Sequence, residues 1–149
     1  AAPEVRPPAA EPVAAASDHT GNVLFMDDEE PIRTMADALL KRLGFEVTCV
    51  ADGQETVRVY CEALRAGKPF DLVIMDLTVP GGMGGKEAMI ELRKIDADVK
   101  GIVSSGYSSD PVMANYKAYG FSGMVAKPYR LTDLAKTIRS VIDSVGEDA

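Results

Sequence analysis

The chain has 149 residues, a length that fits one domain with enough residues to bury a hydrophobic core. Hydrophobic residues make up 46% and charged residues 26%, and no apolar run approaches the roughly 20 residues that cross a bilayer, so we expect no direct membrane insertion. The formal net charge of -7 argues against a nucleic-acid partner, because phosphate backbones attract basic surfaces, and it favours a protein or a cation.

Residues 1–20 differ in composition from the rest of the chain. They are mostly Ala and Pro, without a periodic apolar face that would offset the entropy of ordering. We therefore predict a Pro/Ala-rich linker over residues 1–20 and one folded domain over residues 21–149. The segment lacks the pattern of a secretion signal, and the chain has no initiator Met, so we expect a fragment of a longer protein.

From residue 21 onward, short apolar runs alternate with stretches of helical periodicity. In chain order, the pattern predicts a strand at 23–26, a helix at 32–43, a strand at 46–50, a helix at 57–64, a strand at 71–75, a helix at 88–95, a strand at 101–104, a helix at 111–119, a strand at 123–126 and a helix at 131–145. Gly44 and Gly67 are predicted to end the first two helices, and Pro111 to open the fourth.

Five strand–helix units in series predict an α/β fold, a doubly wound five-stranded parallel sheet with helices on both faces. The flavodoxin-like strand order 2-1-3-4-5 places strands 1 and 3 side by side at the topological switch point, where ligands bind beyond the carboxyl ends. Cys49 and Cys61 lack metal-ligand or CxxC spacing, and we interpret them as reduced core thiols of a cytosolic chain.

Three of the predicted strands end in charged residues. Asp27 and Asp28 follow the first strand, Asp76 follows the third, and Lys127, with Pro128 after it, follows the fifth. If these strand ends meet, the three carboxylates would raise one another's pKa unless a cation lay between them. Hard oxygen ligands with partial hydration suit Mg²⁺ best. The sequence thus predicts a pocket for a divalent cation and a phosphoryl group.

Each of these residues also has a simpler interpretation when taken alone. The acids from Asp27 to Glu30, with Pro31, would stabilise the start of a helix. Asp76 would cap a turn, and Lys127 would be a solvated surface lysine. Their joint occurrence at strand ends favours the pocket.

Together these residues resemble the receiver domain of two-component response regulators, over about residues 21–146. The resemblance rests on the Asp27-Asp28 pair, Asp76 with Pro80 four positions later, the hydroxyl of Ser105, and Lys127-Pro128. It implies that Asp76 takes a phosphoryl group from phosphohistidine on a histidine kinase or a histidine phosphotransfer protein. The domain would then catalyse its own phosphorylation and dephosphorylation without turning over an external substrate.

The resemblance also assigns roles to the other site residues. Asp28, Asp76 and the backbone carbonyl of Thr78 would ligate Mg²⁺, while Asp27 would act mainly through bound water. Lys127 would pair with a phosphoryl oxygen, and Ser105 would donate a hydrogen bond to another. Ser104 competes with Ser105 for that role, but Ser105-Gly106-Tyr107 fits the family pattern better.

Two features depart from the receiver pattern. Met124 stands three positions before Lys127, where the family usually has an aromatic residue whose rotation accompanies the switch. Methionine repacks easily but does not reproduce a ring that moves between two rotamers. The loop over residues 80–85 is one residue longer than usual and holds four glycines, which predicts mobility beside Asp76. A tight helix entry and a role in partner docking both stay open for this loop.

Other phosphate chemistries fit the sequence less well. Around Lys86, a nucleotide-binding P-loop would need Gly in place of Pro80 and Ser or Thr in place of Glu87. Haloacid dehalogenase-like phosphatases have an Asp two positions after their nucleophile, where this chain has Thr78.

The chain ends at Ala149, shortly after the last predicted helix, without room for a DNA-binding effector. With the linker upstream, this favours the C-terminal receiver of a hybrid sensor histidine kinase, cytoplasmic and tethered through an upstream membrane sensor. A free-standing single-domain response regulator is the second possibility. A degenerate receiver that acts only as a protein-interaction module is the third.

Overall fold

The computed structural model of the chain describes residues 21–106 and 110–148, with side chains up to residue 142. The predicted linker over residues 1–20 and Tyr107 lie outside the described residues, so the linker stays a prediction. The described elements are β1 (Gly21–Met26), α2 (Glu30–Arg42), β2 (Phe45–Val50), α3 (Gly53–Arg65), β3 (Leu72–Asp76), α4 (Gly85–Ile95), β4 (Gly101–Ser105), α5 (Pro111–Ala114), the 3-10 helix η2 (Tyr116–Tyr119), β5 (Gly123–Ala126) and α6 (Leu131–Asp148).

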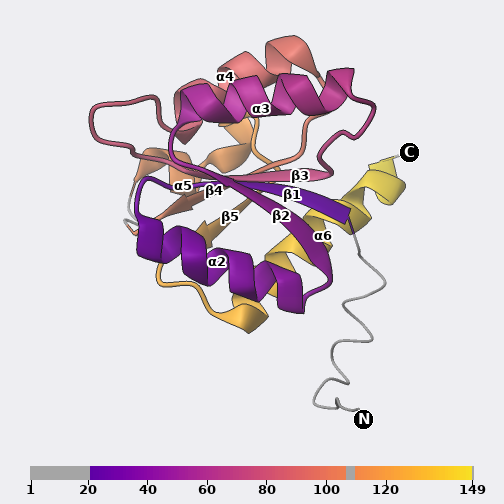
Figure 1. Ribbon diagram of the computed structural model, residues 1–149. Coiled ribbons are helices and arrows are strands. Elements are labelled where there is room, and N and C mark those ends of the chain that lie inside the picture. The colour runs from indigo at the N-terminus through magenta and orange to yellow at the C-terminus, as the bar shows by residue number, and fades with distance from the viewer. Residues whose placement is uncertain (1–20, 107–109, 149) are drawn as a thin grey trace.

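The strands form one parallel sheet in the order β2-β1-β3-β4-β5, which confirms the predicted flavodoxin-like arrangement. Helices α3 and α4 cover one face of the sheet, and α2 and α6 cover the other (Figure 1). Both faces are therefore protected from water, as the nearly continuous apolar runs of the central strands require. The carboxyl ends of β1, β3, β4 and β5 point to the same edge, where Asp27, Asp28, Asp76 and Lys127 lie.

The sheet separates two hydrophobic clusters, because alternate side chains of each strand point to opposite faces. One cluster lies under α3 and α4 and includes Leu24, Met26, Val73, Met75, Tyr60, Met89 and Leu92. The other lies under α2 and α6 and includes Val23, Phe25, Leu72, Ile74, Leu40, Leu134 and Ile138. Strands β1 and β3 contribute to both clusters, so the backbone that carries the acidic residues is fixed from two sides.

Local signals explain where most helices begin and end. Pro31 occupies the first turn of α2, and the Asp52 carboxylate caps α3 by accepting a hydrogen bond from Glu55 N at 2.9 Å. Gly44 and Gly67 follow α2 and α3 with φ of 100° and 77°, a conformation that glycine adopts without strain, as predicted for the two helix stops.

The predicted helix over residues 111–119 is wrong as a single element. Asp110 caps α5 by accepting from Val112 N, but the helix ends after one turn at Asn115, with φ of -135° and ψ of 45°. The chain continues as the 3-10 helix η2 and stops at Gly120 with φ of 93°. Asparagine is a weak helix former, because its side chain can hydrogen-bond nearby backbone groups in non-helical conformations, and the apolar spacing of this segment did not reveal the break.

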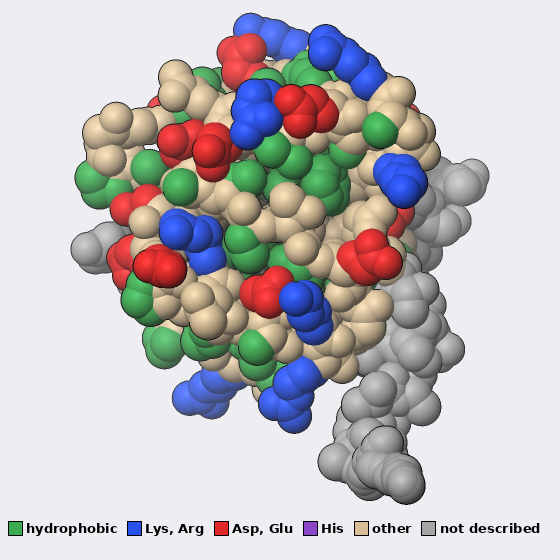
Figure 2. Space-filling model, viewed as in Figure 1, with side chains coloured by type: hydrophobic (Ala, Val, Ile, Leu, Met, Phe, Trp, Pro, Cys, Tyr) green, Lys and Arg blue, Asp and Glu red, His purple; other side chains and the backbone are tan. Residues whose placement is uncertain are grey.

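Both cysteines are free, as predicted, and both are partly buried rather than fully enclosed; Cys49 packs against the hydrophobic cluster under α2 and α6. Cys49 lies on edge strand β2, and Cys61 on α3. Basic and acidic side chains alternate over the face in Figure 2, with apolar side chains between them, so the net charge of -7 does not form one acidic patch there. Within the described part of the chain, no helix is long and apolar enough to span a membrane.

Candidate functional site

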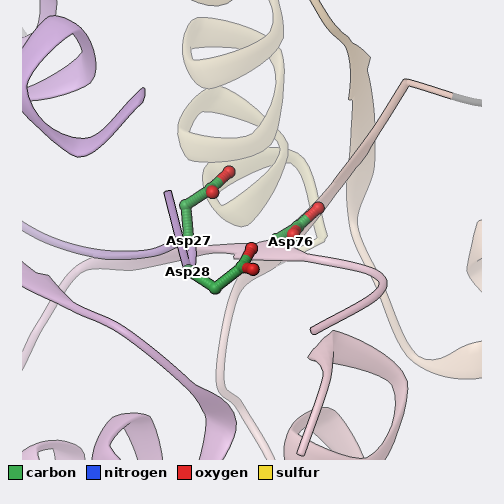
Figure 3. A group of neighbouring side chains, drawn as sticks. All are labelled: Asp27, Asp28 and Asp76. Carbon is green, nitrogen blue, oxygen red and sulfur yellow. The ribbon is translucent and has the colours of Figure 1, made fainter. Parts of the chain in front are cut away.

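Asp27, Asp28 and Asp76 lie together at the carboxyl ends of β1 and β3. Met26 is opposite Met75 in the parallel register, so the next residues, Asp27 and Asp76, come out of the sheet at the same level. One oxygen from each of the three carboxylates lies within 4.8 Å of the others, and Figure 3 shows the side chains gathered at this end. The predicted convergence of the acids is thus present in the structure.

The acids differ in their exposure to solvent. Asp27 is 0% exposed and Asp76 is 5% exposed, while Asp28 is exposed. Buried carboxylates are unfavourable unless a charge or hydrogen bonds compensate them. The backbone N of Glu29 donates a hydrogen bond to Asp27 Oδ1 at 2.9 Å and compensates one oxygen of the carboxylate. The Arg33 guanidinium donates to the backbone carbonyl of Asp27 at 2.8 Å.

Lys127 supplies the cation of the pocket. Its ammonium nitrogen lies 2.7 Å from Asp27 Oδ2 and 3.2 Å from Asp76 Oδ1, and the side chain is only 17% exposed. Burial lowers the pKa of Lys127, but the hydrogen bond to Asp27 and the charges of both carboxylates outweigh it and hold that pKa above its usual value. Lys127 is therefore charged and shared between two acids.

The ionisation of Asp76 reflects a balance of opposing effects. The net effect raises the pKa of Asp76 from 3.8 to about 6. Burial is the largest cause, the Lys127 ammonium lowers the pKa, and the carboxylates of Asp27 and Asp28 raise it. The predicted mutual effect of the carboxylates is present for Asp76, but desolvation is the larger cause. At pH 7 the carboxylate is mostly ionised, the form that a nucleophile needs.

An open cavity of about 410 Å³ lies above these strand ends. It is lined by Asp28, Glu29, Asp76, Thr78, Pro80, Ser105, Gly106 and Lys127. Of the predicted site residues, only Asp27 is absent from this lining, because it is buried beneath Lys127. The cavity joins carboxylates, a hydroxyl and an ammonium, a set of groups suited to a metal ion and a phosphoryl group.

The structure separates the two adjacent serines. Ser105 lines the cavity, whereas Ser104 is 0% exposed, and its hydroxyl is hydrogen-bonded to the phenol of Tyr129. The location of Ser105 fits the preferred assignment, and its role stays a prediction. The Ser104–Tyr129 contact was not predicted, nor was the contact of Arg33 with Asp27, and the Lys127-Pro128 peptide bond is cis.

The two departures from the receiver pattern have distinct surroundings. Met124 is partly buried on β5 and lines a groove against α6 instead of the acidic cavity. Gly84 and Gly85 are buried at the start of α4, where a Cβ on Gly84 would collide with the Leu77 carbonyl. This close approach favours a tight helix entry for the glycine-rich loop, and its mobility stays a prediction.

Comparison with known proteins gives this arrangement a family. The model of the response regulator receiver domain matches residues 23–139. The chain belongs to the response regulator receiver domain family. It is therefore a signalling domain of the two-component type, and receiver domains interact with histidine kinases or phosphotransfer proteins.

Individual relatives fall into several kinds of protein. The chain is 32% identical over 133 residues to the sensor kinase CckA of Brucella abortus, covering 88% of this chain and 14% of CckA. It is 32% identical over 120 residues to the chemotaxis protein CheY of Thermotoga maritima, covering 80% of this chain and 95% of CheY. The chain thus spans a small part of the sensor kinases it matches and nearly all of a single-domain receiver.

Solved receiver structures share the fold. The receiver domain of sensor histidine kinase PA1611 from Pseudomonas aeruginosa, with a magnesium ion coordinated in its active site cleft, has a TM-score of 0.71 and 27% identity. The similarity covers 84% of this chain and 99% of that one. Vibrio cholerae CheY4 has a TM-score of 0.71 and 30% identity, covering 83% of this chain and 99% of CheY4.

Proposed function

We propose that Asp76 is the phosphoacceptor of this receiver domain. Both oxygens of Asp27 are engaged, one by Glu29 N and the other by Lys127, and Asp27 does not line the cavity. Asp76 lines the cavity, ends a fully buried strand and has Lys127 beside one oxygen. This combination of a fixed backbone, access from the cavity and an adjacent cation carries the proposal.

A magnesium ion fits the donor set of the pocket. Asp28 and Asp76 offer carboxylate oxygens to the cavity, Thr78 lies on its wall for a backbone carbonyl contact, and Asp27 lies close enough to act through bound water. All of these are hard oxygen ligands of the kind that Mg²⁺ prefers. When bound, the ion would offset charge on the phosphoryl oxygens and on the nucleophile.

The reaction then follows from the positions of the residues. The ionised Asp76 attacks phosphorus of a phosphohistidine in line, the P–N bond breaks, and an acyl phosphate forms on the carboxylate. Lys127 shifts its ammonium from the acids to a phosphoryl oxygen, and Ser105 donates a hydrogen bond to another. The side chain of Asp76 then carries about two negative charges in place of one, which biases the neighbouring loops toward a second arrangement.

The similarity to CckA, and to the sensor kinase/phosphatase CqsS of Vibrio cholerae, supports a place within a hybrid sensor histidine kinase. In that setting the domain receives phosphate from a kinase core and passes it to a histidine phosphotransfer protein. The full-length similarity to CheY keeps a free-standing response regulator as the second candidate. Initial rates of transfer from a panel of phosphorylated histidine donors would separate a relay from a terminal acceptor.

Acetyl phosphate with Mg²⁺ tests the acceptor directly, with intact mass as the readout. Wild type is expected to gain one phosphoryl group that hydroxylamine removes, and Asp76→Asn to gain none. Asp98→Asn, an exposed acid outside the pocket, controls for the loss of one charge and is expected to behave as wild type. A wild type without any mass gain would indicate a degenerate, interaction-only receiver, and a gain that persists in Asp76→Asn would exclude this acceptor.

A further inference from the structure

Tyr129 lies two residues after Lys127, and its side chain packs against the strands that carry the acidic pocket. Its side chain is largely buried, with 7% exposure, and its hydroxyl is hydrogen-bonded to the hydroxyl of Ser104. Ser104 is the β4 residue paired in register with Asp76, and it immediately precedes Ser105. One buried hydrogen bond therefore joins the loop after Lys127 to the strand beside the proposed acceptor.

The ring of Tyr129 makes a second contact, on β1. It packs edge to face against Phe25, with ring centroids 6.0 Å apart and an interplanar angle of 78°. Phe25 lies two residues before Asp27, the closer acid partner of Lys127. Tyr129 thus contacts the strands on both sides of β3, one through its ring and one through its hydroxyl.

The backbone of Lys127 is held on its other side. Lys127 N donates to the Ser105 carbonyl at 3.0 Å, which ties the end of β5 to the end of β4. The chain is therefore fixed at Lys127 by this bond and at Tyr129 by the phenol. From this fixed segment the side chain of Lys127 extends to Asp27 and Asp76.

We propose that Tyr129 is a positioning residue that holds Lys127 over the acidic pocket through its hydrogen bond to Ser104; this inference rests on the proposed function. A lysine side chain is flexible, and a phosphoryl group gains most from a cation that is already in place. Loss of the phenol oxygen would leave the buried Ser104 hydroxyl without its partner and loosen the loop that carries Lys127. Lys127 would then spend less time at the geometry that the reaction needs.

Tyr60→Phe provides a matched control for Tyr129→Phe. Tyr60 is 2% exposed, and its hydroxyl donates to Asp96 Oδ2 at 2.8 Å, on the α3 and α4 side of the sheet. Both substitutions delete one buried, hydrogen-bonded phenol oxygen and keep the ring. They differ in that only Tyr129 lies beside Lys127, so a general loss of stability is separated from an effect on the pocket.

The first readout is the initial rate of phosphorylation by acetyl phosphate at saturating Mg²⁺. Tyr129→Phe and Ser104→Ala are each expected to slow it by about 10-fold, as for a small misplacement of a catalytic group, and the double variant by no more than either single one. Tyr60→Phe is expected to react as wild type. Mg²⁺ affinity is expected to stay unchanged in all four variants, because no metal-ligand candidate is altered.

A double-mutant cycle with Lys127→Ala then tests whether the effect passes through the lysine. If Tyr129 acts by positioning Lys127, Tyr129→Phe will lower the initial phosphorylation rate when Lys127 is present. It will cause no further decrease in the Lys127→Ala background. An unchanged rate in Tyr129→Phe would overturn the inference, as would an equal slowing in both backgrounds.

The same cycle is followed by denaturant unfolding without metal or phosphodonor. Non-additive changes in unfolding free energy between Tyr129→Phe and Lys127→Ala would support the coupling, and additive changes would overturn it. If wild type is not phosphorylated at all, the proposed function fails, while this unfolding cycle still decides whether Tyr129 positions Lys127.

Discussion

The ammonium of Lys127 lies 2.7 Å from Asp27 Oδ2, a carboxylate that is fully buried and that does not line the acidic cavity. The contact to Asp76 Oδ1 is longer, at 3.2 Å. In the unphosphorylated protein, Lys127 therefore has a structural role: its positive charge compensates a carboxylate that is not exposed to solvent.

Lys127→Ala is expected to lower the unfolding free energy of the metal-free protein by about 2–4 kcal/mol, because it leaves Asp27 buried without its cation. Mg²⁺ should still bind and should restore part of this loss, while the response to phosphodonor is blunted. Denaturant unfolding with EDTA and with Mg²⁺ measures both effects. Lys86→Ala, which removes an exposed cation above the Tyr119 ring, is the control. Equal stability of Lys127→Ala and wild type would contradict the structural role.

Stability of the metal-free protein is expected to fall as pH rises from about 4 to 6. The pKa of Asp76 is raised from 3.8 to about 6. Burial is the largest cause, the charges of Asp27 and Asp28 add to it, and the charge of Lys127 opposes it. The folded state thus binds a proton on Asp76 that the unfolded state has released, and this advantage is complete below pH 3.8 and lost above about 6. The full change corresponds to roughly 3 kcal/mol.

Asp76→Asn is the matched variant for this pH dependence. It should be more stable than wild type at pH 7 in EDTA, and the two should converge toward pH 4. Unfolding free energies measured at several pH values check this, and saturating Mg²⁺ should remove most of the difference at neutral pH. A difference that stays constant from pH 4 to 7 would mean that burial does not raise the pKa of Asp76.

Asp28→Asn is expected to weaken Mg²⁺ binding by about 10-fold or more, because it removes an exposed carboxylate oxygen that faces the cavity. The fold should be unaffected, since the side chain is at the surface. Titration with Mg²⁺, followed by calorimetry, gives the dissociation constants, and Asp98→Asn accounts for the change in overall charge. Equal affinity of Asp28→Asn and wild type would contradict the ligand assignment.

Gly84→Ala is expected to destabilise the protein by about 1–3 kcal/mol and to slow phosphorylation, because its Cβ would collide with the Leu77 carbonyl next to Asp76. Gly82→Ala in the same loop is the control, since its Cβ would meet Val79 Cγ1 at 3.4 Å and Asp52 Cβ at 3.7 Å, close to ordinary contact. Denaturant unfolding and initial phosphorylation rates should separate the two. Equal behaviour of both variants would show that the loop accommodates a methyl group at either position.

The fold and the acidic pocket were predictable because they depend on short-range patterns and on one rule of topology. Apolar runs such as residues 72–75 mark buried strands, and parallel strands bring the residues after their carboxyl ends to one edge. Asp27, Asp76 and Lys127 follow such runs directly, so their convergence needs no knowledge of side-chain packing.

The missed features depend on packing that the linear pattern does not contain. Ser104 and Tyr129 are 25 residues apart and meet because the chain turns back after Lys127. Arg33 reaches the Asp27 carbonyl only after α2 has set its direction. The break at Asn115 lies within a stretch whose apolar spacing is helical, and the local preference of asparagine prevailed over that spacing.

The acidic pocket carries a net charge of -3 when Asp27, Asp28, Glu29 and Asp76 are ionised against Lys127, in a chain whose total is -7. An anionic phosphodonor therefore approaches against electrostatic repulsion, which extends over about 8–10 Å at moderate ionic strength. Added salt should accelerate phosphorylation by such a donor when magnesium is scarce, and should change the rate less when magnesium is abundant. A donor protein that surrounds its phosphohistidine with basic residues would avoid this barrier, so charge at the docking interface would favour protein donors over small anions.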